Sequence, residues 1–124
     1  MTTPRYTATE AARLTDASVE SVRTWAKRGL IGRLGDTTFD GDDIVEIATR
    51  HHLAQVGIEG HRATPFAHAA DQPFDVVYYG LFANGDAIVD FARPEGAVVT
   101  IEVDLAQIRS AIAARMSEES PDES

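Results

Sequence analysis

The residues best suited to chemistry with a partner are six basic side chains between positions 5 and 33, a stretch that contains only three acidic residues. The six are Arg5, Arg13, Arg23, Lys27, Arg28 and Arg33. They give the stretch a local charge of +3, and a basic surface of this kind attracts the phosphate backbone of nucleic acid. The whole chain has a net charge of −9, but residues 63–124 alone sum to −8. We therefore expect the acidic half to lie away from any nucleic acid.

Other kinds of chemistry have little support. The chain has four histidines, but His51 and His52 are adjacent and would point about 100° apart on a helix, and no acidic residue falls at a metal-ligand spacing. We expect no metal, no cofactor and, without a nucleophile-and-base motif, no enzyme activity. The absence of cysteine excludes disulfides and is typical of a cytoplasmic protein. The first residues do not show the basic-then-apolar order of a signal peptide, and no apolar run approaches 18 residues, so we expect neither a signal peptide nor a membrane span.

Caps and apolar spacing predict the elements that would hold the basic residues. Thr7 and Glu10 form the pattern of a capping box, and Ser18 and Asp40 are typical N-cap residues. The expected elements of this half are helices over about 8–14, 18–28 and 40–56, with a small β-hairpin over 30–39.

In the second half, the spacing of apolar residues changes from one typical of helices to one typical of strands. Asn84-Gly85, a strong hairpin signal, follows a nearly continuous apolar run. Three strands are expected over about 74–83, 87–92 and 97–103, before a helix that ends near 116. We interpret the chain as α+β and divide it into four parts: a DNA-binding domain (1–60), a linker (61–73), a βββα module (74–116) and a disordered acidic tail (117–124).

The first half resembles a known family. Its pattern is Tyr6-Thr7-x-x-Glu10-Ala11-Ala12-x-Leu14-x-x-x-Ser18-x-x-Ser21-Val22-Arg23-x-Trp25-x-Lys27-x-Gly29-Leu30-Ile31, followed by Asp43-Ile44. This pattern is similar to the winged helix-turn-helix DNA-binding domain of MerR-type regulators and excisionase-type proteins. The resemblance covers about residues 5–60, half of the chain.

This resemblance implies a DNA-binding mode. The second helix would enter the major groove, the wing would touch the flanking backbone, and two copies would bind an inverted repeat. Residues that the resemblance places at or near the DNA are Ser18, Ser21, Arg23, Thr24, Lys27 and Arg33. Arg13 is a further DNA-binding candidate because it belongs to the basic stretch. Arg23 would reach a guanine edge or a phosphate, and the hydroxyl groups would hold phosphates.

The strand over 74–83 is apolar on both faces, whereas one helix can cover only one face of a three-stranded sheet. The second face must be covered by the chain's own first domain, by a second copy or by another protein. We favour a homodimer because aromatic residues are typical of interface cores. The residues expected at this interface are Tyr78, Tyr79, Leu81 and Phe82.

Two functions follow from these patterns. The first is a cytoplasmic, sequence-specific DNA-binding protein, a MerR-like transcriptional regulator that binds double-stranded DNA as a homodimer. The alternative is a protein-interaction module, such as an antitoxin or adaptor, whose acidic half binds another protein. Glu20 and a wing tip with little positive charge favour the alternative, whereas the recognition-helix pattern and the local +3 favour the first.

Overall fold

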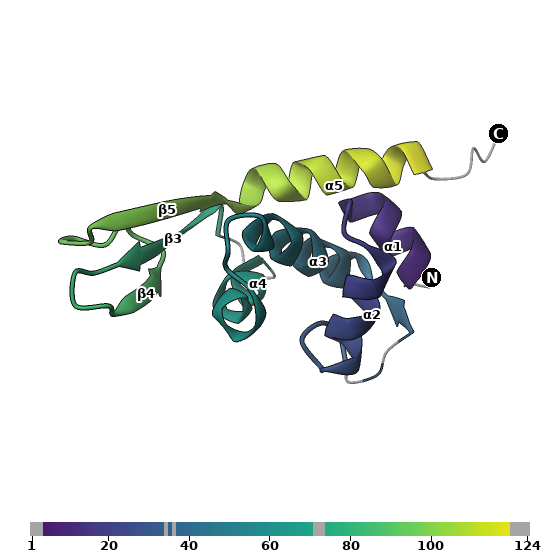
Figure 1. Cartoon of the computed structure of the whole chain (residues 1–124). Helices are drawn as coiled ribbons and strands as arrows, with labels where there is room; N and C mark the ends of the chain where they lie inside the picture. Colours follow the sequence, from purple (N-terminus) through teal and green to yellow (C-terminus); the bar gives the residue numbers. More distant parts are fainter. Residues whose placement is uncertain (1–3, 34, 36, 71–73, 120–124) are drawn as a thin grey trace.

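A computed structural model describes residues 4–33, 35, 37–70 and 74–119, and Figure 1 shows the arrangement of the chain. Helices and small antiparallel sheets both occur, which confirms the α+β class. None of the described helices is long and apolar enough to cross a membrane. The elements in chain order are β1 (Tyr6–Thr7), α1 (Ala8–Thr15), α2 (Val19–Lys27), β2 (Thr38–Phe39), α3 (Gly41–Ala54), a 3₁₀ helix (Gly60–Ala63), α4 (Thr64–Ala70), β3 (Val76–Leu81), β4 (Ala87–Asp90), β5 (Val99–Asp104) and α5 (Leu105–Glu119).

The predicted helix starts are confirmed by their caps. The Thr7 backbone N–H donates to the Glu10 carboxylate over 2.8 Å, and the Glu10 N–H donates to the Thr7 hydroxyl over 3.2 Å. Ser18 accepts from the backbone N–H of Ser21 at the start of α2. Asp40 caps α3 with a reciprocal pair of bonds of its own. Each cap satisfies N–H groups that a helix leaves without a partner, so these boundaries are set locally.

The hairpin predicted over 30–39 is wrong. In the described part of this segment, the only strand is β2, and it pairs with β1: Tyr6 lies opposite Phe39 and Thr7 opposite Thr38. Arg5 reinforces this pairing by donating to the carbonyl and hydroxyl oxygens of Thr38. The partner of β2 therefore lies more than thirty residues earlier in the chain, where a local turn signal carries no information about it.

The first core joins the two ends of the chain. Its buried residues come mainly from α1, α2 and α3, and Ile112 of α5 is buried among them. Figure 1 shows α5 running back over α1 and α3 after it leaves the sheet. The helix that was expected to complete a separate βββα module therefore packs on the N-terminal helices. Its last turns include Ser117–Glu119, which were predicted to be disordered; residues 120–124 lie outside the described part.

The segment 61–73, predicted to be a linker, contains the end of the 3₁₀ helix and α4; residues 71–73 lie outside the described part. Phe66 is fully buried in the second core. Arg50 of α3 is also buried and donates to the Gly60 carbonyl over 3.1 Å and to the Thr64 hydroxyl over 3.0 Å. Burial lowers the pKa of Arg50, and the neighbouring carboxylate of Glu46 opposes that shift. Side-chain burial and two hydrogen bonds thus order a segment that has no clear helical period.

The strands form an antiparallel sheet in the order β4-β3-β5. In the register of β3 and β5, Val77 lies opposite Val103 and Tyr79 opposite Ile101. The predicted turn at Asn84-Gly85 joins β3 and β4, and Gly85 adopts a φ of 93°, which suits glycine. Figure 1 shows this sheet extending away from the helices, with α1 and α2 at the opposite end of the molecule.

Candidate functional site

The surface of α2 separates into an apolar and a polar side. Val22 and Ala26 are buried against the first core, whereas Glu20, Arg23 and Lys27 are exposed. The two cations are four residues apart, and side chains at that spacing share one face of a helix. The helix therefore presents two cations to solvent and is anchored by its other side.

Arg23 and Lys27 line a hollow of about 410 Å³. The other lining residues are Thr7, Ala8, Thr9, Gly35, Thr37 and Phe39. Thr7–Thr9 form the N-terminal end of α1, where the helix dipole adds a partial positive charge. Two cations and a helix N-terminus thus converge on one concave surface. The Glu10 carboxylate already accepts from the Thr7 N–H at that terminus, so the attraction for an anion such as phosphate comes mainly from Arg23 and Lys27.

Three residues with hydroxyl groups were also predicted to contact DNA: Ser18, Ser21 and Thr24. Each is either hydrogen-bonded within the chain or half-buried. The Ser18 hydroxyl accepts from the Ser21 N–H over 3.0 Å and donates to the Ser21 hydroxyl over 2.9 Å. Ser21 and Thr24 are half-buried. None of these three side chains lines the hollow that contains Arg23 and Lys27.

The two other arginines predicted at the DNA lie elsewhere. Arg33 is exposed but lines a separate hollow, together with Arg5 and the acidic residues Asp40 and Asp43. Arg13 is exposed in the last turn of α1. The structure thus brings together Arg23 and Lys27, and it does not place Arg33 or Arg13 in the same hollow.

The turn between α1 and α2 is held by the C-terminal helix. Asp16 adopts a left-handed φ of 67° in this turn. Its carboxylate accepts a hydrogen bond from Arg115 of α5 over 2.8 Å, and the same guanidinium donates to the Leu14 carbonyl over 2.9 Å. The bond from Arg115 holds the pKa of Asp16 below its usual 3.8. Sequence patterns gave no sign of Arg115, because its partners lie about a hundred residues earlier.

The residues predicted to form a dimer interface point to both faces of β3. The Tyr79 ring lies 5.8 Å from the Phe66 ring of α4, measured between centroids. On the other face, the Arg93 guanidinium lies 5.7 Å from the centroid of the Tyr78 ring. Leu81 and Phe82, the remaining two, are half-buried. Each tyrosine thus packs against another part of the same chain.

The connection between β4 and β5 covers much of this second face. A Cβ atom placed on Gly80 would lie only 2.7 Å from the Pro94 side chain, so the connection packs directly on the strand. Phe74 and Phe91 stack with their centroids 3.8 Å apart. The apolar character of both faces of β3 therefore has an explanation within one chain, which the sequence pattern did not predict.

The histidine pair shows no ligand geometry. The His51 and His52 rings are tilted by 54° with centroids 5.6 Å apart, and burial lowers the pKa of His52. In the part of the chain that the structure describes, no three His, Cys, Asp or Glu side chains are grouped so as to hold a metal ion.

Comparison with known proteins adds no family assignment. No protein-family model matches the chain, and no curated protein matches it significantly. Function must therefore be inferred from the residues and from the way the fold arranges them.

Proposed function

We propose that the protein is a cytoplasmic, sequence-specific DNA-binding protein, a MerR-like transcriptional regulator that binds an inverted repeat as a homodimer. The observation that carries this proposal is the convergence of Arg23, Lys27 and the N-terminus of α1 on one exposed hollow. This hollow adjoins a short helix that is capped at Ser18 and joined to α1 by a tight turn.

In the proposed complex, α2 is the recognition helix of a helix-turn-helix. The major groove of B-DNA is about 12 Å wide and admits one α-helix. Arg23 donates to the O6 and N7 acceptors of a guanine, the commonest specific contact of arginine with DNA. Lys27 and the first turn of α1 hold a backbone phosphate, which orients the helix in the groove.

The overall negative charge is compatible with this mode of binding. Exposed carboxylates such as Asp90, Glu102 and Asp104 belong to the sheet, which extends to the end of the molecule opposite α2 (Figure 1). Exposed charges separated by more than about 10 Å are largely screened at moderate salt. The carboxylates of the sheet therefore weaken non-specific attraction to DNA without preventing a local contact at α2, whereas Glu118 of the same acidic half lies on α5, which packs on α1.

The test is a selection from random genomic DNA fragments, with sequencing of the retained pool. Wild-type protein is expected to enrich an inverted repeat, and Arg23→Ala is expected to enrich it much less strongly. Arg93→Ala is the matched control, because Arg93 is an exposed arginine in the connection between β4 and β5, and it should enrich the same sequence. Absence of any enriched sequence at low salt, where phosphate contacts are strongest, would refute the proposal.

A further inference from the structure

β5 forms one edge of the sheet. It pairs with β3 along its whole length, from Val99 to Asp104. Among the described residues no strand pairs with its other side. An edge strand presents backbone N–H and C=O groups that can pair with another strand, and proteins usually cover or blunt such an edge.

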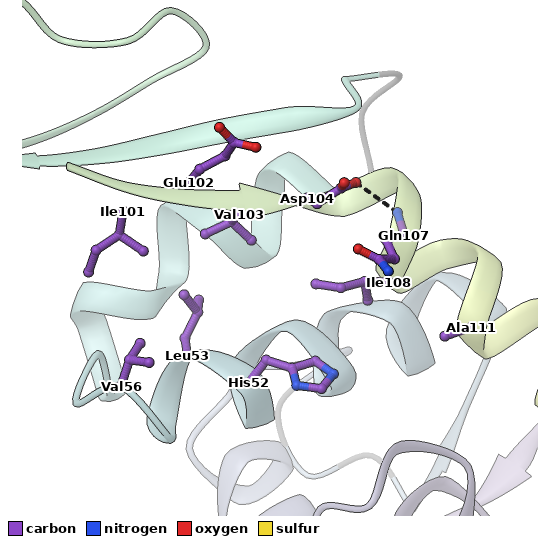
Figure 2. A pocket seen from close by; sticks show the side chains of 10 residues that line it. All are labelled: His52, Leu53, Val56, Ile101, Glu102, Val103, Asp104, Gln107, Ile108 and Ala111. Carbon is purple, nitrogen blue, oxygen red and sulfur yellow. Dashed lines mark hydrogen bonds between the residues drawn. The ribbon is translucent and has the colours of Figure 1, made fainter.

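An apolar hollow of about 430 Å³ lies beneath this edge, between β5 and the ends of α3 and α5. Figure 2 shows β5 in front of its neighbouring strand, with the side chains of Ile101 and Val103 directed toward Leu53 and Val56. Glu102 points to the opposite side of the strand. Val56 is 60% exposed, so part of this apolar lining is in contact with solvent.

A strand added to this edge would fill the hollow. Residues of neighbouring strands that lie opposite each other direct their side chains to the same face. Every second side chain of an added strand would therefore enter the space above Val56. The hollow suits apolar residues there, because most of its lining is aliphatic. The aliphatic residues are Leu53, Val56, Ile101, Val103, Ile108 and Ala111, and the polar ones are His52, Glu102, Asp104 and Gln107.

We propose that the occupant is β5 of a second copy of this chain, paired antiparallel about a two-fold axis at Ile101. This inference rests on the proposed homodimer and identifies its interface. The strand has the pattern that the hollow requires, since Val99, Ile101 and Val103 alternate with polar residues. In a two-fold interface the same patch serves both partners, so the two hollows lie side by side and the inner side chains of both β5 strands pack in the shared apolar space.

The charges of β5 favour this register. A two-fold axis at Ile101 places Val99 opposite Val103 and Thr100 opposite Glu102. An axis at Glu102 would oppose two copies of that carboxylate, and an axis at Val103 would oppose Glu102 and Asp104. An axis at Thr100 would oppose no carboxylates, but it would pair only Val99–Ile101 within β5, whereas the Ile101 axis pairs Val99–Val103. Like charges directly opposite each other destabilise a strand pair. In the Ile101 register, apolar residues of the two copies lie opposite each other on the inner face of the sheet, and no two carboxylates are opposed.

The proposed β5 interface can be tested by measuring the oligomeric state of variants with substitutions at exposed residues. Light scattering at tens of micromolar should give wild-type protein twice the chain mass of 13.4 kDa. Val56→Asp should raise the dimer dissociation constant at least about tenfold, because it places a carboxylate in an apolar interface. Ile88→Asp, on the opposite edge strand and 41% exposed, is the matched control and should remain dimeric. A monomeric wild type, or a dimer disrupted only by Ile88→Asp, would overturn the proposal.

Disulfide cross-linking tests the register, and the absence of native cysteines makes the result specific. Under mild oxidation Ile101→Cys should form a covalent dimer, because the two residues meet at the axis within the Cα separation that a disulfide allows. Ile88→Cys should remain largely monomeric on a denaturing gel. If Ile101→Cys does not cross-link while Ile88→Cys does, the interface uses another edge and the proposal is wrong.

These results are separable from the DNA-binding proposal. Arg23→Ala should remain dimeric although it enriches the inverted repeat much less strongly. Val56→Asp should keep α2 intact and bind a single half-site with reduced affinity for the inverted repeat. Monomeric wild-type protein that still enriches a specific sequence would overturn the β5 interface and leave DNA binding through α2 intact.

Discussion

At the scale of single residues, the position of a cation matters more than the total charge. Arg23 and Lys27 share an exposed face beside the N-terminus of α1, whereas Arg33 lies beside Asp40 and Asp43 in another hollow. A phosphate in the first hollow would meet two cations, with the Glu10 carboxylate bonded to Thr7 nearby, whereas in the second hollow it would meet two cations beside two carboxylates. We therefore expect large effects on DNA binding from the first pair and a small effect from Arg33.

The contribution of Lys27 can be measured through salt dependence. A lysine that contacts a phosphate releases about one counterion, so Lys27→Ala should reduce the slope of log K against log salt by about 1. Fluorescence anisotropy at several salt concentrations measures this slope. Arg33→Ala is the comparison, and a slope that changes as much for Arg33→Ala as for Lys27→Ala would argue against the assigned phosphate site.

The environment of Asp16 leads us to expect that the free energy of unfolding depends on pH in the acidic range. Its pKa is depressed in the folded state, chiefly by the hydrogen bond from Arg115. This bond therefore stabilises the fold above the usual pKa of 3.8, and its contribution is lost as the pH falls through the lower folded value.

Asp16→Asn tests this contribution, because asparagine also tolerates the left-handed conformation. The side chains of the pair are 63% and 41% exposed, so the expected loss at neutral pH is less than about 1 kcal/mol in the free energy of unfolding. Urea denaturation should show the two proteins converging as the pH falls below 3.8. A difference that is unchanged at acidic pH would show that the charge of Asp16 plays no part.

At the scale of elements, the sequence predicted the features that depend on neighbouring residues, such as helix starts. It did not predict the pairing of segments that lie far apart in the chain. The caps at Thr7, Ser18 and Asp40 could be read from sequence because each bonds within three residues. The hairpin over 30–39 was mispredicted because β2 pairs with a strand near the N-terminus. In the candidate site, Arg23 and Lys27 were predicted individually, but their convergence with the N-terminus of α1 depends on tertiary packing.

The order of α4 should depend on Arg50. Arg50→Met removes the donors to Gly60 and Thr64 and leaves their acceptors unsatisfied, so we expect a loss on the order of 2 kcal/mol in the free energy of unfolding. Arg62→Met is the control, because Arg62 is exposed in the same segment, and it should change stability by less than about 0.5 kcal/mol. Equal stability of the two variants in urea would contradict the role assigned to Arg50.

The packing of the β4–β5 connection on β3 gives a second prediction at this scale. Gly80→Ala would place a methyl group 2.7 Å from Pro94, and we expect a destabilisation of about 1–3 kcal/mol in thermal or urea unfolding. Adding Pro94→Gly should recover part of this loss, because it removes both the Cγ atom at 2.7 Å and the Cβ atom at 2.9 Å that the new methyl group would meet. Strictly additive effects of the two substitutions would show that they do not interact.

At the scale of the whole molecule, one helix links the two halves of the chain. α5 begins at the end of β5, buries Ile112 in the first core and bonds through Arg115 to the turn before α2. The edge of β5 and the turn that positions α2 are therefore connected by a single rigid element. In the proposed dimer this connection would set the distance and orientation between the two α2 helices, and so the spacing of the two half-sites.

The measurement that bears most directly on DNA binding through α2 compares affinities for the enriched duplex and for a scrambled duplex of equal composition. At one fixed salt concentration, wild-type protein should prefer the enriched duplex by about a thousandfold or more. Arg23→Ala should lose about 1–3 kcal/mol of affinity for the enriched duplex and little for the scrambled one. Equal affinity of wild-type protein for both duplexes, or an unchanged preference in Arg23→Ala, would contradict the proposed role of α2.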